Sequence, residues 1–87
     1  METGKISVPI KTLDQVRTDA SMIVQEILGG WHMRQRLNQL GIHEGDVLII
    51  KRCCAMRGPI LVQVHGMDVA LGRAVARHIR VRPQDEA

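Results

Sequence analysis

The sequence predicts a small all-β barrel that contains one short helix. The chain has 87 residues, a length that suits one compact domain with one hydrophobic core. Hydrophobic residues make up 45 % of the chain and charged residues 24 %, a balance typical of folded globular proteins rather than disordered ones. Short runs of β-branched residues alternate with glycine and proline, which indicates several short strands. Because closure pairs the edges of a sheet, we expect a closed or partly open barrel.

Residues 1–12 are interpreted as a lead-in to this barrel. Residues 6–10 favour an extended segment, and a proline within it favours an edge position. Thr12 and Gln15 stand at the spacing of a capping box, so one helical turn is expected to follow, with Leu13 and Val16 directed inward.

The first core strand is expected over residues 22–28, where β-branched residues precede a pair of glycines. The period then changes over residues 31–40, where Met33, Leu37 and Leu40 recur at helical spacing. This pattern predicts one amphipathic helix with those three side chains on its inner face.

The end of this helix is predicted from a glycine. Gly41 is able to adopt the left-handed conformation after the last turn, so that Ile42 folds back on Leu37 in a Schellman arrangement. The other four strands are expected over residues 47–54, 60–65, 67–71 and 78–82, with a helical turn over 73–77. The domain therefore extends over residues 13–83, and residues 84–87 form a tail.

Residues 34–42 read RQRLNQLGI, and Gly45 and Val47 follow them. This stretch resembles the arginine-rich helix and the turn of the FeoA (ferrous iron transport protein A) family. Residues 58–60, 64–66 and 69–81 resemble the closing half of the same family, and the similarity covers Leu13 to Pro83. The resemblance implies a five-stranded SH3-like barrel, with the helix between the first two core strands.

Three features depart from the pattern of the family. Glu44 stands where FeoA proteins often have proline, residues 55–58 replace a usual proline and glycine-aspartate loop, and Cys53 and Cys54 are not typical. These positions lie in loops or at a strand end, where sequence changes leave the fold intact, and the loop with Met56 is a candidate for partner specificity.

The resemblance implies a non-catalytic accessory protein of bacterial ferrous iron uptake. Such a protein docks on the FeoB permease in the membrane, through the cytosolic domain of that permease, and modulates it. The residues also argue against an enzyme, because neither Ser7 nor Ser21 lies in a Gly-x-Ser-x-Gly motif and no glycine loop for phosphate is present. We expect no cofactor.

The chain is expected to stay in the cytoplasm without inserting into a membrane. Its longest apolar run, residues 47–50, is much shorter than a membrane-spanning helix requires. Its first residues have no basic region followed by an apolar stretch, as a secretory signal has.

Cys53, Cys54 and His65 are the candidates for metal ligands, because thiolate and imidazole bind transition metals. Their spacing matches no metal-binding motif, and adjacent strand residues point to opposite faces. We therefore expect at most weak binding of Fe²⁺ or another transition metal. The two cysteines are adjacent, closer than an unstrained disulfide prefers, so we expect both to remain reduced.

Two groups of residues are candidates for a partner interface. Trp31, Arg34 and Gln35 belong to the predicted helix, and Trp and Arg often anchor interfaces. The alternative for Trp31, which we slightly favour, is a cap on the barrel. Met56 and Arg57 form the second group, in a loop where methionine is hard to bury. Homo-oligomerisation is left open.

Two alternatives from other functional classes are kept. One is a small barrel that binds nucleic acid, since the net charge is +3. Its binding surface would be a basic cluster that consists of Arg73, Arg77, Arg80 and Arg82. With one Trp and no Tyr or Phe, the chain has few aromatic side chains to stack on bases, and no nucleic acid is expected. The other is a transition-metal sensor with a site between chains.

Overall fold

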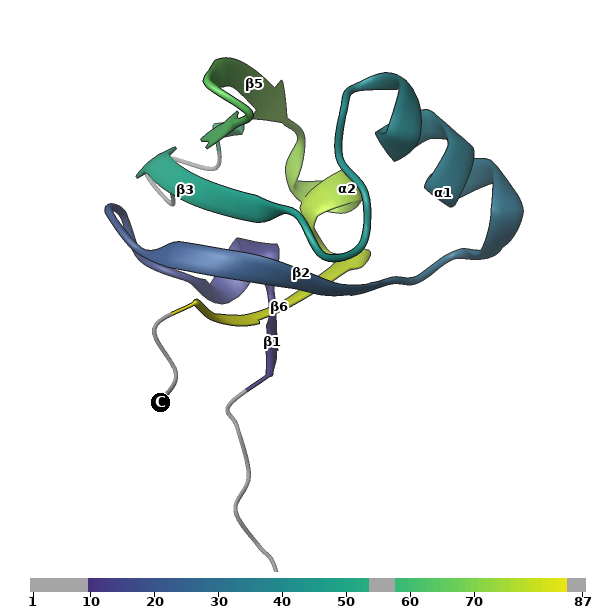
Figure 1. Ribbon diagram of the computed structural model, residues 1–87, viewed down its shortest axis with the longest axis horizontal. Helices are drawn as coiled ribbons and strands as arrows, with labels where there is room; N and C mark the ends of the chain where they lie inside the picture. Colours follow the sequence, from purple (N-terminus) through teal and green to yellow (C-terminus); the bar gives the residue numbers. More distant parts are fainter. Residues whose placement is uncertain (1–9, 54–57, 85–87) are drawn as a thin grey trace, which may run out of the picture.

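The computed structural model describes residues 10–53 and 58–84. Their strands form one six-stranded antiparallel sheet with the order β1-β6-β2-β3-β4-β5 (Figure 1). The sheet curls so that β5 lies across the core from β2 and β6, as in a partly open barrel (Figure 1). The strands are β1 (Lys11–Thr12), β2 (Ser21–Ile27), β3 (Val47–Arg52), β4 (Ile60–Val64), β5 (Met67–Leu71) and β6 (Ile79–Pro83), and the helices are η1 (Leu13–Gln15), α1 (Gly30–Gln39) and α2 (Arg73–Ala76).

The predicted all-β fold with one helix between the first two core strands is confirmed. All five predicted core strands are present, with ends that differ by a residue or two. The structure adds β1, a strand of two residues in which Lys11 pairs with Val81 of β6. The predicted extended segment at residues 6–10 lies outside the described residues except for Ile10, which is exposed.

The core of the barrel consists of aliphatic side chains from every strand except β1. Alternation along β4 places every second residue inside, so Ile60, Val62 and Val64 are buried. No polar or charged side chain among the described residues is buried. The fully buried large side chains are Leu13, Leu37, Ile42, Leu48, Ile50, Ile60, Leu71, Ile79, Val24, Val62, Val64 and Val81.

The predicted turn after β1 is a short 3-10 helix, η1. Gln15 accepts a hydrogen bond at 3.3 Å from the backbone N–H of Thr12 through its Oε1, which is one half of a capping box. Leu13 and Val16 are both buried. The inward direction of these two side chains is therefore confirmed.

The C-terminal end of α1 has the predicted Schellman geometry. Gly41 has φ +86°, and its N–H donates to the carbonyl oxygen of Asn38 at 3.0 Å, while the N–H of Ile42 donates to that of Leu37 at 3.0 Å. Ile42 is fully buried as a result. The inner face was predicted wrongly at Leu40, which is 40 % exposed, because this residue is the C-cap, where the chain leaves the helical path.

None of the helices among residues 10–53 and 58–84 is long and apolar enough to cross a membrane.

Candidate functional site

The outer surface of α1 carries an exposed tryptophan. Trp31 lies in the first turn of the helix with 66 % of its surface exposed. Its ring contacts that of the adjacent His32 edge-on, with 5.1 Å between the ring centroids. The barrel-cap interpretation of Trp31 is therefore wrong. The physical reason is that aliphatic side chains, among them Leu37 of α1 itself, already fill the core, so the first turn of α1 stays exposed.

Arg34 is tied to the loop that follows α1. Its Nη1 donates a hydrogen bond to Oε2 of Glu44 at 3.1 Å, and the same oxygen accepts from the backbone N–H of Ile27 at 3.2 Å. Glu44, which stands where FeoA proteins often have proline, thus joins the helix to the end of β2. Gln35 is exposed on the same surface of α1.

Three of the predicted site residues cannot be placed. Cys54, Met56 and Arg57 lie outside the described residues, so the proposed loop contact and one of the candidate ligands stay predictions.

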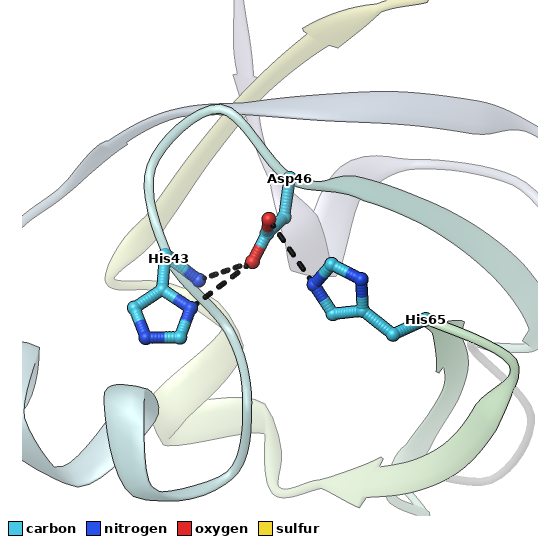
Figure 2. A network of polar contacts seen from close by, with 3 residues as sticks. All are labelled: His43, Asp46 and His65. Carbon is cyan, nitrogen blue, oxygen red and sulfur yellow. Dashed lines mark hydrogen bonds and ion pairs between the residues drawn. The ribbon is translucent and has the colours of Figure 1, made fainter.

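A polar network, which the sequence argument missed, joins two turns at one end of the barrel (Figure 2). Oδ2 of Asp46 accepts a hydrogen bond at 2.7 Å from the backbone N–H of His43 and lies 3.3 Å from Nδ1 of the same residue. Oδ1 of Asp46 lies 3.2 Å from Nε2 of His65. One carboxylate therefore holds the loop after α1 and the turn between β4 and β5 together.

The environment of Asp46 favours the charged carboxylate. Partial burial opposes this charge, but hydrogen bonds from the backbone and ring of His43 and from His65 outweigh it, so the pKa of Asp46 lies below its ordinary value. The Asp46 side chain is 16 % exposed, whereas the side chain of His65 is 63 % exposed. The spacing of His43 and Asp46 within one tight turn was the available signal, because a short carboxylate often accepts from a nearby backbone N–H.

Cys53 and His65, the two candidate metal ligands that the structure describes, do not come together. Arg52, the residue before Cys53, pairs with the beginning of β4, whereas His65 follows its end, so the strand separates the two. Within the described part of the chain, no group of three or more His, Cys, Asp or Glu side chains is arranged to hold a metal ion.

The state of Cys53 also differs from the expectation. The structure records this residue in a disulfide bond, so the predicted reduced thiol at this position is wrong. The side chain packs against the core, and its sulfur lies 3.0 Å from the carbonyl oxygen of Val16.

Most of the basic cluster has partners within the chain. Arg80 donates to Glu26 at 3.2 Å, and Arg82 donates to the amide oxygen of Gln25 at 2.7 Å. Arg77 lies 3.7 Å from a carboxylate oxygen of Asp14. These contacts leave less free positive charge for a phosphate backbone than the sequence suggested.

The comparison with protein families decides the relationship. The model of the FeoA domain matches residues 11–83. The chain belongs to the FeoA family. This family is linked to ferrous iron transport, and the membership confirms the resemblance that the helix and the closing strands indicated.

Solved FeoA structures have the same fold. An iron uptake regulatory protein (FeoA) is 29 % identical over 86 % of this chain and 97 % of its own, with a TM-score of 0.78. A FeoA-like protein from Clostridium acetobutylicum is 22 % identical over 94 % of both chains, with a TM-score of 0.79. The SH3-like barrel is therefore the fold of this FeoA chain.

The same fold occurs as part of larger regulators. A manganese-dependent transcriptional repressor is 23 % identical over 90 % of this chain, with a TM-score of 0.79, but the match spans 44 % of the repressor. At this identity the likeness concerns the fold alone. No curated protein sequence matches the chain significantly.

Proposed function

We propose that this FeoA chain is a non-catalytic, cytoplasmic accessory protein of bacterial ferrous iron uptake that docks on the cytosolic domain of a FeoB-like permease. The observation that carries the proposal is the exposed Trp31 on α1. A large aromatic side chain that contributes nothing to the core is typical of residues that anchor protein interfaces.

The residues around Trp31 favour a protein partner. Trp31, Arg34 and Gln35 are three and four residues apart along α1, a spacing that places them on one surface of a helix. Helix α1 contains no acidic residue, so this surface suits a partner with acidic groups. The ion pair with Glu44 holds the Arg34 side chain in place and reduces the entropy lost on binding.

The proposed mechanism is binding alone. A module that modulates a permease must have different affinities for two states of that permease, because a ligand shifts an equilibrium only through such a difference. Nucleotide bound to the cytosolic domain is a practical means of changing its state.

Isothermal titration calorimetry of the chain with the cytosolic domain of the cognate permease, with and without guanine nucleotide, tests the proposal. We expect saturable binding that changes with nucleotide and weakens about thirtyfold in Trp31→Ala, the usual effect of losing an interface anchor. The matched control is Gln39→Ala, an exposed change on the same helix, which should bind as the unchanged chain does.

Two results would contradict the proposal. Absence of binding to the permease domain rules out docking, and equal binding by Trp31→Ala and the unchanged chain rules out this surface. A parallel anaerobic titration with Fe²⁺ that showed one tight site per chain would instead favour a metal sensor or carrier.

A further inference from the structure

Strand β5 forms an open edge of the sheet. It pairs with β4 on one side and ends the strand order on the other. The opposite edge is β1, which has two residues. Strand β5 has five residues, without proline, lysine or a bulge, so it lacks most of the features that protect an edge from pairing.

The turn before β5 determines which of its backbone groups face outward. His65 and Gly66 have φ of +52° and +78°, as in a two-residue type I′ turn. Val64 and Met67 flank this turn and form a hydrogen-bonded pair. Because hydrogen-bonded pairs alternate with non-bonded ones along an antiparallel ladder, the N–H and C=O groups of Asp68 and Ala70 point away from β4.

These outward groups have no acceptor or donor within the described chain. Among residues 10–53 and 58–84, no backbone group outside the strand ladders forms a hydrogen bond with the backbone of Asp68 or Ala70. No side chain of these residues does so either. Both residues are exposed. The edge therefore presents two donors and two acceptors at the spacing of a strand.

We propose that the edge of β5 is a self-association site, where β5 of a second copy of this chain pairs antiparallel across a two-fold axis at Val69. In this register, Asp68 of each copy lies opposite Ala70 of the other. Each such pair exchanges two hydrogen bonds, so the two pairs form about four. The sheet continues from one copy into the next.

The proposal does not depend on docking to a permease. The self-complementary register is the reason for choosing a second copy as the partner. A two-fold axis at Val69 uses every outward backbone group, whereas an axis at Asp68 would place two like charges directly opposite each other.

Side chains on the inner face support the same register. Met67 and Val69 lie opposite Val64 and Val62 of β4, which are buried. Met67 is nevertheless 60 % exposed and Val69 is only partly buried, because no described part of the chain covers this edge. In the paired copies, Met67 lies opposite Leu71 and Val69 opposite Val69. Met67, which is open to water in the single copy, thus lies beside the buried Leu71 of the second copy, and the apolar row continues from one copy into the other. Because the edge is short, we expect a weak, reversible dimer.

Sedimentation equilibrium over a wide range of chain concentration tests the dimer. Two charge variants at the same exposed position test the register. Ala70→Glu places a second negative charge opposite Asp68 and should raise the dissociation constant roughly two- to thirtyfold, whereas Ala70→Lys places a positive charge there and should lower it by a similar factor. The controls Gln39→Glu and Gln39→Lys make the same charge changes on α1 and should have little effect.

Amide hydrogen exchange by NMR gives an independent readout. Slower exchange of the Asp68 and Ala70 amides at high chain concentration supports the proposal, because these amides face solvent in the single copy. A chain that stays monomeric throughout the concentration range overturns the proposal, as does a dimer whose stability changes in the same direction in Ala70→Glu and Ala70→Lys. Circular dichroism spectra confirm that each variant is folded.

Discussion

Nε2 of His65 lies 3.2 Å from Oδ1 of Asp46, although the two residues belong to different turns, one before β3 and one after β4. The contact joins the turn between β4 and β5 to the loop between α1 and β3 (Figure 2). His65 achieves this position because it has φ +52°, a conformation that a type I′ turn requires and that few residues other than glycine adopt readily. The two turns are therefore coupled through one carboxylate.

Asp46→Ala should destabilise the fold more than His65→Ala. The first change removes the acceptor for the backbone N–H of His43 as well as both histidine contacts, and we expect a loss of about 1–3 kcal/mol in the free energy of unfolding. The second removes one largely exposed contact and should cost less than about 1 kcal/mol. Urea unfolding monitored by circular dichroism measures both, and equal losses would contradict the central role of Asp46.

The contribution of Asp46 should depend on pH in a defined direction. Its pKa is lower in the folded chain than its ordinary value, so the unfolded chain binds more protons in acid. The stabilisation is fully present above the ordinary carboxyl pKa of about 4 and is lost as the pH falls through the lower pKa of the folded chain.

The difference in unfolding free energy between the unchanged chain and Asp46→Asn measures this dependence. It should shrink as the pH falls below about 4, where the carboxylate of the folded chain takes up its proton. A difference that grows in acid would show that the pKa of Asp46 is raised rather than lowered.

Glu44 should stabilise the junction of α1 and β2 through two contacts. Glu44→Gln keeps an oxygen for the N–H of Ile27 but removes the charge opposite Arg34, and it should cost a few tenths of a kcal/mol, as expected for an exposed ion pair. Glu44→Ala removes both contacts and should cost about 1 kcal/mol. Thermal unfolding at low and high salt separates the two, because salt should reduce only the charge-dependent part.

Gly41→Ala should destabilise the chain by about 1–2 kcal/mol. The cost comes from φ +86° at this position rather than from crowding, since an added Cβ would have no atom within 4 Å. Gly72→Ala is the matched control: its Cβ also has free space, but Gly72 has φ −65°. Because Gly72 is the N-cap of α2, where glycine is preferred to alanine, the control should lose about 0.5 kcal/mol or less in urea unfolding. An equal loss in both variants would contradict the conformational explanation.

Local signals in the sequence were sufficient for most of the fold. Runs of β-branched residues between glycine and proline residues marked the five core strands, and Gly41 followed by Ile42 marked the end of α1. These features depend on backbone preferences and on the hydrophobic pattern within a few residues, so they are legible in a single chain. The resemblance of the helix and closing strands to FeoA proteins depended on the same local features.

Tertiary structure decided the features that depend on distant contacts. Strand β1 is too short to have a pattern of its own and forms because β6 offers it an edge. The exposure of Trp31 was decided by how completely the aliphatic core fills the barrel. His65 meets Asp46 because the curl of the sheet brings two turns together.

The sequence by itself therefore determined that this protein is a small FeoA-type barrel, which strands it has and where its helix stops. Only the tertiary structure decided which side chains meet across the barrel and which backbone edge stays open. The physical reason is that strand and cap preferences act over a few neighbouring residues, whereas cross-strand contacts and edges depend on the order in which distant strands pair.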